Sequence, residues 1–503
     1  MSSMKIKSLL IANRGEIAIR IIKTARKMGI RSYVIKTAKE PNAWYLEEAD
    51  EIIDFSENHD DVIPEFLDIE RIIKSARKHQ IDAIHPGYGF LAENPDFARR
   101  CEEEKITFIG PSHDAIYRMG HKTIAKELAR ENNVPLLGGS LGSLSDAEEA
   151  RKIANKIGYP VILKAAAGGG GRGMRVVEKE KDVERMFTLA TNEAEKAFNN
   201  PDVFLERFVR EPRHIEFQIL GDQHGNIVHL GERECSVQRK HQKLLEESPS
   251  PALNNALRKK MGEAAINIAK SVNYYSAGTV EFLLDDDNSF SFMEMNTRIQ
   301  VEHPVTEMVT GIDLIEQMIL IAEGEKLPFT QKEIKLNGWA IEWRINAEDV
   351  QSGFSPSLGT IEKISWTENE HVRVDTGVRD GSVITPYYDS MIAKLIIHAE
   401  TREKALQQSS MAIRKFWIKG PKTTLAFCRA VLQNRNFRKG KFNTSFLSKE
   451  LKIHYQNEPD EALLAAFFAT YDYAREMNEN EEKPLHTENG KAITPWVLKK
   501  RLR

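Results

Sequence analysis

Residues 278–304, GTVEFLLDDDNSFSFMEMNTRIQVEHP, limit the fold of the chain more than any other stretch, because they combine a hairpin pattern with paired acids. Apolar and polar residues alternate on both sides of the turn-forming run DDDN at 285–288, which predicts a β-hairpin. With an even number of residues in the loop, Glu281 and Glu294 leave the same face as opposite or diagonal neighbours, with Cβ atoms roughly 5–8 Å apart. Carboxylates this close repel each other unless a cation lies between them, and oxygen ligands suit Mg²⁺ or Mn²⁺. The hairpin therefore predicts a metal site.

The alternation continues beyond the hairpin. Polar residues occupy every second position, namely Glu294, Asn296, Arg298, Gln300 and Glu302. If the segment stays extended, these side chains line one wall and the apolar residues between them pack behind it. A solvated strand face is the usual explanation of polar alternation alone. The nearby Glu281 and the stop at His303-Pro304 favour a functional wall instead.

Composition narrows the classes of protein that the chain can belong to. Its 503 residues are too many for one core and predict about three domains. The net charge of −3, from 71 basic and 74 acidic residues, argues against nucleic acid or a membrane surface as a partner. The longest apolar run, 462–469, is too short to span a membrane, and the N-terminus resembles neither a signal nor a transit peptide. Cys101, Cys235 and Cys428 form no CxxC pair, which suits a reducing cytoplasm.

Strand and helix patterns alternate in the first part of the chain. We expect buried strands at 5–12, 31–36, 81–85 and 106–109, with helical patterns between them, and hence a parallel sheet. Helical stretches are expected at 112–135 and 401–416, and a strand at 203–209.

A glycine-rich segment, KAAAGGGGRGMRVV at 164–177, lies between two strand-like stretches. It formally contains GxGxxG, but the dinucleotide version needs a helix directly afterwards, and no Gly-Lys-Ser/Thr of a phosphate-binding P-loop is present. Strand, glycine loop and strand predict a flexible flap whose backbone N–H groups can meet an oxyanion. Lys164, at the end of the first strand, can place a positive charge on phosphates.

Three motifs together resemble one known family. EMNTRIQVEHPVTE at 294–307, HPGYGFLAEN at 85–94 and RECSVQRKHQK at 233–243 resemble the biotin carboxylases, members of the ATP-grasp ligases, and the resemblance covers roughly residues 5–450. It implies an α/β fold with a Rossmann-like N-terminal domain at 1–115 and an ATP-grasp core at 116–332. The core would carry a mobile glycine-rich lid at about 135–204. A smaller mixed α+β domain would follow at 333–450, and then a helical tail with a disordered end at 451–503.

The resemblance also implies an activity. ATP and bicarbonate would form carboxyphosphate, and biotin on a separate carrier protein would be carboxylated, as the first half-reaction of an acyl-CoA or pyruvate carboxylase. The chain contains no Ala-Met-Lys-Met string, so we expect no covalent biotin on it. The implied partners are a biotin carboxyl carrier protein, a carboxyltransferase subunit and a second copy of the chain in a homodimer. The final carboxyl acceptor stays open, because no carboxyltransferase domain is present.

The same resemblance implies roles for individual residues. For Mg²⁺ or Mn²⁺ it implies Glu281, Glu294 and Asn296. For ATP it implies Lys122, Lys164, Gly169, Gly170, Gly171, Glu206, Arg207, Val209, His214, Gln238, His241, Glu281, Glu294 and His454. For bicarbonate and biotin it implies Tyr88, Lys243, Arg298, Gln300, Val301, Glu302 and Arg344. Glu302 would be the base that deprotonates bicarbonate, Lys243 and Arg298 would hold bicarbonate, and Arg344 would stabilise the biotin enolate oxygen.

Two other functions are compatible with the sequence. The chain could be another ATP-grasp ligase that makes an acyl or carbamoyl phosphate, or a urea carboxylase, and it could also be a non-catalytic scaffold subunit. Biotin dependence and bicarbonate-stimulated ATP hydrolysis would separate these alternatives.

The chain departs from the family pattern in one segment. The family usually has an Asp-rich segment after the second strand, where this chain has KTAKEPNAWYLEEADE at 36–51. An apolar helical stripe at 463–474 predicts a helix that docks on its own domain or on a partner.

Overall fold

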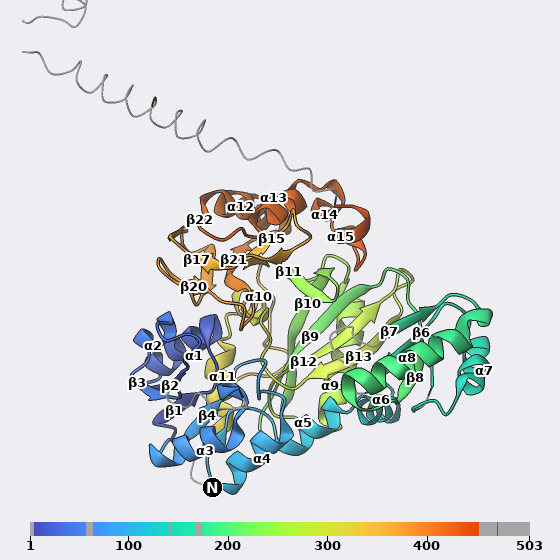
Figure 1. The fold of residues 1–503 in the computed structure, drawn as a ribbon, viewed down its shortest axis with the longest axis horizontal. Coiled ribbons are helices and arrows are strands. Elements are labelled where there is room, and N and C mark those ends of the chain that lie inside the picture. The colour runs from blue at the N-terminus through green and yellow to red at the C-terminus, as the bar shows by residue number, and fades with distance from the viewer. Residues whose placement is uncertain (1–4, 57–63, 141, 167–173, 452–469, 471–503) are drawn as a thin grey trace, which may run out of the picture. The chain divides into compact units, whose positions relative to one another are not determined.

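The first sheet is parallel, as the sequence predicts, and its strands lie in the order β3-β2-β1-β4-β5 (Figure 1). The strands are β1 (Ser8–Ile11), β2 (Arg31–Lys36), β3 (Glu51–Asp54), β4 (Ala83–His85) and β5 (Thr107–Phe108). The four strands expected from the sequence are confirmed, whereas β3 was not predicted. Only Ile53 of β3 is buried, so this strand lacks the apolar run that marks the others.

Helices pack on both faces of this sheet because alternate residues of its central strand point in opposite directions. Leu9 and Ile11 share a core with helix α1 (Gly15–Lys27). Leu10 belongs to a second core with helices α3 (Ile69–Lys78) and α4 (Pro95–Glu103). Two short helices, α2 (Trp44–Glu48) and a 3₁₀ turn (Glu65–Leu67), complete this part.

The computed structural model describes residues 5–56, 64–140, 142–166, 174–451 and 470. Met1–Leu451 and Lys452–Arg503 are two separate units. Four predictions fall wholly or almost wholly outside the described residues. They are the glycines at 169–171, His454, the apolar stripe at 463–474 and the helical tail with a disordered end at 451–503. None of the described helices is both long and apolar enough to cross a bilayer.

The second sheet has eight antiparallel strands in the order β13-β12-β9-β10-β11-β14-β21-β19. Its strands are β9 (Arg213–Gly221), β10 (Ile227–Arg239), β11 (Gln242–Ser248), β12 (Ser276–Leu284), β13 (Phe290–Asn296), β14 (Trp339–Asn346), β19 (Val372–Thr376) and β21 (Met391–Ala399). Strands β12 and β13 form the predicted hairpin. The sheet therefore runs without interruption from the middle of the chain into its C-terminal part (Figure 1).

Helices α5 (His113–Gly120), α6 (Lys122–Glu131) and α9 (Asn255–Lys270) share an apolar core with β9, β12 and β13. The prediction of one helical stretch over 112–135 was wrong in one respect. The backbone of His121 is extended, with φ −88° and ψ 104°, and separates α5 from α6. As a result Lys122 lies in the first turn of α6, where its side chain can reach the cavity described below.

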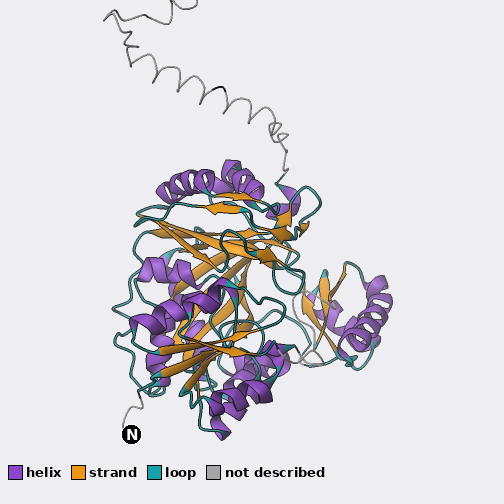
Figure 2. Ribbon diagram, turned by 60° about the vertical axis from the view of Figure 1, so that its left-hand side comes forward, coloured by secondary structure: helices purple, strands orange, loops and turns teal. Residues whose placement is uncertain are grey.

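A smaller sheet, β7-β6-β8, stands apart with its own core. It consists of β6 (Val161–Ala165), β7 (Met174–Val177) and β8 (Val203–Arg207), with helices α7 (Ala147–Ile157) and α8 (Val183–Phe198) and a 3₁₀ turn (Glu180–Asp182). Figure 2 shows the two helices on one side of these strands. Strands β6 and β7 pair on either side of the glycine-rich segment, as the sequence predicts for a flap.

The C-terminal part extends the large sheet with β14, β21 and β19, and helix α12 (Arg402–Lys415) covers β14 and β21. The C-terminal part also contains three two-stranded sheets. Their strands are β15 (Glu348–Asp349) with β16 (Ser355–Pro356), β17 (Gly359–Thr360) with β20 (Val383–Ile384), and β18 (Lys363–Ser365) with β22 (Trp417–Lys419). The remaining helices are α10 (His303–Thr310), α11 (Leu314–Ala322), α13 (Leu425–Gln433), α14 (Arg435–Arg438) and α15 (Phe446–Lys449). Of these, α10 packs against β10, β11, β14 and β21, close to the centre of the large sheet.

Candidate active site

A cavity of about 1670 Å³ collects side chains from every part of this fold. Every predicted site residue that the structure describes lines it: Tyr88, Lys122, Lys164, Glu206, Arg207, Val209, His214, Gln238, His241, Lys243, Glu281, Glu294, Asn296, Arg298, Gln300, Val301, Glu302 and Arg344. Ligand pockets for one small molecule typically occupy about 300–1,000 Å³. This cavity has room for more than one substrate.

At the hairpin, Glu281 of β12 lies directly opposite Glu294 of β13 in the antiparallel register. Burial would raise the pKa of Glu281, but Lys243 and His214 hold it well below its ordinary value. The surrounding protein and the Glu281 carboxylate both raise the pKa of Glu294, although its side chain is exposed and lines the cavity. The pair therefore carries the repulsion that a divalent cation between two carboxylates relieves, and its oxygen donors suit Mg²⁺. Asn296 is adjacent and donates its side-chain N–H to Glu281 at 2.9 Å.

The polar wall that continues from the hairpin has a different backbone from the predicted one. Strand β13 ends at Asn296, and the chain turns before α10 begins at His303, so the expectation of an extended segment to Glu302 was wrong. Pro304 lies in the first turn of α10, where its missing N–H costs nothing. The five alternating polar residues nevertheless all line the cavity.

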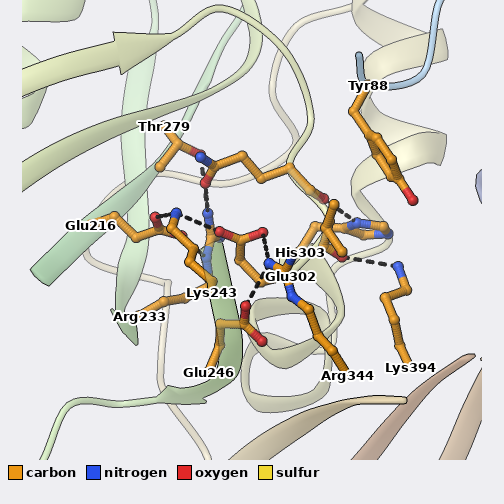
Figure 3. Close-up of polar contacts among 12 residues, drawn as sticks. Tyr88, Glu216, Arg233, Lys243, Glu246, Thr279, Glu302, His303, Arg344 and Lys394 are labelled. Atoms are coloured by element: carbon orange, nitrogen blue, oxygen red, sulfur yellow. Dashed lines mark hydrogen bonds and ion pairs between the residues drawn. The ribbon is translucent and has the colours of Figure 1, made fainter. Parts of the chain in front are cut away.

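Lys243 lies at the centre of the acidic groups. Its Nζ atom is 2.5 Å from Glu216 Oε2 and 2.6 Å from Glu302 Oε1 (Figure 3). The same atom lies 3.0 Å from Glu281 Oε1. Burial would lower the pKa of Lys243, but the three carboxylates raise it well above its ordinary value. The lysine is therefore a fixed positive charge beside the carboxylate at the end of the wall.

Arg344 of β14 reaches the same carboxylate from the other side. Its Nη2 atom lies 2.9 Å from Glu302 Oε2 and 2.5 Å from Glu246 Oε1 (Figure 3). Lys243, Arg344 and Arg233 hold the pKa of Glu302 well below its ordinary range, against the effect of its burial. Glu302 is therefore ionised between two cations.

A register shift explains how Lys243 and Glu246 of one strand both face this site. Val237 pairs with Leu245 and Gln238 pairs with Lys243, so Leu244 is an extra residue in β11. In a regular strand, residues three apart point to opposite faces. A bulge of one residue restores the common direction.

A second charged group lies where β6, β8 and α6 border the cavity, which is the side called the lid side below. Glu206 of β8 accepts from Lys164 of β6 at 2.5 Å and also from Lys126 of α6. Burial would raise the pKa of Glu206, but Lys164 and Lys126 lower it to about 2. Lys126 Nζ also lies 3.6 Å from the centroid of the Phe204 ring. Burial lowers the pKa of the neighbouring Lys122.

The remaining described residues predicted to meet ATP also line the cavity. His214 Nε2 lies 2.9 Å from Glu281 Oε2, and this carboxylate raises the pKa of His214 against the lowering effect of burial. Gln238 and His241 lie on the β10–β11 hairpin, and Val209 lies just after β8. Arg207 is largely exposed, with Nη2 3.9 Å from Asp285 Oδ2.

Arg298 and Gln300 connect the wall to its surroundings. Arg298 donates to Asn296 Oδ1 at 3.0 Å and to Glu93 Oε2 at 2.9 Å. Gln300 donates to Glu281 Oε1 at 2.9 Å and accepts from Arg233 Nη2 at 2.8 Å. Both side chains are therefore positioned by hydrogen bonds.

Tyr88 and Lys394, both drawn in Figure 3, meet at Glu16 near the start of α1. The Tyr88 hydroxyl donates to Glu16. Lys394 of β21 is fully buried, lies 3.1 Å from Glu16 Oε1 and donates to the Val301 carbonyl oxygen at 2.9 Å. The turn that carries Tyr88 is thus linked through Glu16 and Lys394 to the loop that carries Val301.

Four residues of the site were not singled out from the sequence: Glu216, Arg233, Lys126 and Lys394. Glu216 alternates with His214 and Gln218 along β9, and this period of two was a usable signal. Arg233 is completely buried and donates to Glu216, Gln218 and Gln300. In the sequence, Arg233 stands out only as the first residue of the motif RECSVQRKHQK, because a solvated arginine and a buried one look the same there.

Comparison with protein families accounts for nearly the whole described chain. The family described as "Biotin carboxylase, N-terminal domain" matches residues 5–116. "Carbamoyl-phosphate synthase L chain, ATP binding domain" matches residues 121–330, and "Biotin carboxylase C-terminal domain" matches residues 342–449.

Individual proteins give the same result. The chain is 48% identical to biotin carboxylase 1 of Bacillus subtilis (strain 168), over 88% of this chain and 98% of that protein. It is 46% identical to the 2-oxoglutarate carboxylase small subunit of Hydrogenobacter thermophilus, over 92% of this chain and 99% of that protein. The crystal structure of the biotin carboxylase domain dimer of that organism's 2-oxoglutarate carboxylase, in complex with MgADP, ADP and bicarbonate, aligns with a TM-score of 0.86. The identity is 47%, and the alignment covers 90% of this chain and 100% of that one.

Proposed function

The chain belongs to the biotin carboxylase family of ATP-dependent enzymes, and we propose that it uses ATP and bicarbonate to carboxylate biotin on a separate carrier protein. The observation that carries this proposal is the position of Glu302 between Lys243 and Arg344, at 2.6 Å and 2.9 Å, in the cavity that also contains the Glu281–Glu294 pair. One cavity thus offers a carboxylate base, anion-binding cations and a metal-binding carboxylate pair.

The nucleotide binds at the lid side. Lys122, Lys164 and His214 contribute positive charge or hydrogen-bond donors toward the phosphates, and residues 206–209 border the place for the adenine. Glu281, Glu294 and Asn296 would hold Mg²⁺, and Mn²⁺ by the same oxygen-ligand preference. The ion would neutralise the phosphate charge that develops during transfer.

Bicarbonate binds beside Lys243 and Arg298, and Glu302 removes its proton. Because two cations hold Glu302 ionised, it is a weak base until bicarbonate shares the charge of Lys243. The deprotonated bicarbonate oxygen then attacks the γ-phosphorus, the bond to the β,γ-bridging oxygen breaks, and ADP leaves. The resulting carboxyphosphate breaks down to CO₂ and phosphate.

Biotin enters past Tyr88 and places its ureido oxygen near Arg344. Phosphate takes the ureido N–H proton, the nitrogen attacks CO₂, and the guanidinium stabilises the enolate oxygen that appears when the proton leaves. We propose a biotin carboxyl carrier protein and a carboxyltransferase subunit as partners, a homodimer as the assembled form, and a cytoplasmic location. Three cysteines that are all buried and free fit that location.

The test is phosphate release from Mg²⁺–ATP by the purified chain, with and without bicarbonate and free biotin. We expect hydrolysis to require bicarbonate and to rise with biotin. An ATP-grasp ligase with an amine acceptor would not respond to biotin, and a scaffold subunit would not respond to bicarbonate. Equal rates under all conditions would exclude the carboxylase function.

A further inference from the structure

Two buried glutamates face each other behind Arg344. Glu246 of β11 and Glu342 of β14 are directly opposite in the antiparallel register, and both are 0% exposed. Opposite side chains in such a ladder have Cβ atoms about 4.5–5.5 Å apart. The two carboxyl groups are therefore neighbours that are shielded from bulk solvent.

Within the described residues, Glu246 Oε2 and both oxygens of Glu342 have no hydrogen-bond partner. The fourth oxygen, Glu246 Oε1, lies 2.5 Å from Arg344 Nη2. Two ionised carboxylates in this arrangement would repel each other in a medium that screens charge poorly. One proton between them removes the repulsion and supplies the missing hydrogen bond.

The charged surroundings decide which carboxyl keeps the proton. Burial raises the pKa of Glu342 well above its ordinary value, with Lys394 opposing and Glu246 adding to the rise. Burial also raises the pKa of Glu246, to about 7, although Arg344 opposes it. The other titratable groups on the elements packed around the pair are Lys243 of β11, Cys235 of β10, Glu302, His303 of α10 and Lys394 of β21. Burial holds Cys235 and His303 neutral, because it raises the pKa of the first and lowers that of the second.

We propose that Glu246 and Glu342 form a proton-sharing carboxyl pair that positions Arg344 for the biotin step, with Glu342 as the neutral member. This inference rests on the proposed function of Arg344. The Glu342 hydroxyl donates to Glu246, and the single negative charge of the pair holds the guanidinium between Glu246 and Glu302. A second negative charge behind Arg344 would draw the guanidinium away from the cavity and weaken its stabilisation of the biotin oxygen.

The activity test is the pH profile of biotin carboxylation for the wild type and Glu342→Gln. Glutamine copies the shape of a protonated glutamate but cannot lose the proton. At an alkaline pH where the wild-type rate has fallen about tenfold, the variant should stay within ~2-fold of its own maximum. Glu246→Gln removes the charge that holds Arg344, so kcat/KM for biotin should fall about 10-fold or more. Coincident alkaline limbs for the wild type and Glu342→Gln would overturn the proposal.

Glu247→Gln is the matched control, since Glu247 is the next residue of β11, is equally buried and pairs with Arg402 outside the cavity. It should reduce thermal stability and leave the shape of the pH profile unchanged. If Glu247→Gln shifted the alkaline limb as Glu342→Gln does, the effect would come from a general loss of buried charge, and the pair would have no special role.

Infrared difference spectroscopy gives a readout that needs no activity. The wild type should show a protonated-carboxyl C=O band at neutral and mildly alkaline pH that Glu342→Gln lacks. If the variant does not fold, the pH course of this band in wild-type protein with ¹³C-labelled glutamate serves instead. If the protein shows this band but does not carboxylate biotin, the proposed function is wrong and the carboxyl pair still stands. If the band is absent, the carboxyl pair is wrong, whatever the activity.

Discussion

Lys243 Nζ lies 2.6 Å from Glu302 Oε1, although the two residues come from a strand and from the loop before a helix, 59 positions apart. With Arg344 on the other oxygen, this contact holds the pKa of Glu302 well below its ordinary range despite its burial. The base proposed for bicarbonate is therefore ready in its ionised form, and its strength depends on how far substrate draws Lys243 away.

Replacing this carboxylate should stop the first chemical step. Glu302→Gln keeps the size of the side chain but cannot accept a proton. A positioned general base contributes typically ~10²–10⁴-fold, and we expect bicarbonate-dependent ATP hydrolysis to fall by a factor in that range. Phosphate release without biotin measures it. Glu263→Gln, at an exposed position of α9, is the control and should retain the wild-type rate.

Arg344→Gln should affect a later step. It removes a charge-assisted hydrogen bond to the biotin oxygen, which contributes about 1.5–3 kcal/mol, or ~10–150-fold. Carboxylation of free biotin should drop by that factor, while bicarbonate-dependent ATP hydrolysis without biotin continues. Loss of both activities to the same extent as in Glu302→Gln would assign Arg344 to the bicarbonate or nucleotide site.

The Glu281–Glu294 pair predicts a specific response to Mg²⁺. Glu294→Gln removes one ligand and also the repulsion across the hairpin. We expect a large loss of ATP hydrolysis at low Mg²⁺ and little change in thermal stability. Asp286→Asn, on the exposed turn of the same hairpin, should change neither quantity. A normal rate for Glu294→Gln at low Mg²⁺ would remove this residue from the metal site.

The acidic groups around Lys243 predict how stability depends on pH. The pKa values of Glu281 and Glu302 lie below the ordinary value of 4.5, so their contribution is fully present above that value. It is lost as pH falls through their depressed folded-state values. The pKa of Lys243 is raised, so its contribution is present at neutral pH and is lost only as pH rises above the ordinary lysine value.

Lys243→Met leaves three carboxylates without their shared cation, and the free energy of unfolding should fall most at neutral pH. The difference from the wild type should shrink as the pH falls and the carboxylates become protonated. Urea unfolding across this pH range measures it, with the exposed Lys259→Met as the control. A difference that grew toward acid pH would contradict the assignment of the ion pairs.

Lys126 lines the cavity and should matter for ATP, although the family resemblance assigned it no role. When the phosphates draw Lys164 from Glu206, Lys126 remains as the counter-ion of this buried carboxylate. In Lys126→Met, Lys164 must serve both Glu206 and ATP. A hydrogen bond to a charged group contributes about 1.5–3 kcal/mol, so we expect KM for ATP to rise roughly tenfold or more. Lys126→Arg should restore most of the affinity, and an unchanged KM in both variants would show that Lys126 has only a structural role.

Local patterns predicted the parts of the fold that depend on local periodicity. The β12–β13 hairpin was confirmed with Glu281 opposite Glu294, because alternation fixes which side chains share a face. Four strands of the first sheet were confirmed from their apolar runs. The break at His121 and the end of β13 at Asn296 were missed, because tertiary contacts override the helical and alternating patterns there.

Local patterns could not predict contacts between strands that are distant in the sequence. Lys243 and Glu246 point in the same direction only because of an extra residue, Leu244, and no composition signal marks this bulge in β11. Lys126 and Glu206 form an ion pair although they are 80 residues apart in the sequence, and Lys394 and Glu16 form one although they are 378 residues apart. Only the folded chain brings these residues together. The roles that the family resemblance assigns to single residues stay predictions until the variants above are measured.

The unbroken eight-stranded sheet affects how the protein can be divided. Residues 340–343 of β14 pair with residues 245–248 of β11, so the nucleotide-binding part and the C-terminal part share one hydrogen-bonded ladder. A chain cut at residue 332 would expose the edge of β11 with its apolar Leu244 and Leu245, which invites pairing with other chains. The two parts should therefore unfold in one cooperative transition, and truncation between them should yield aggregates in place of two working halves.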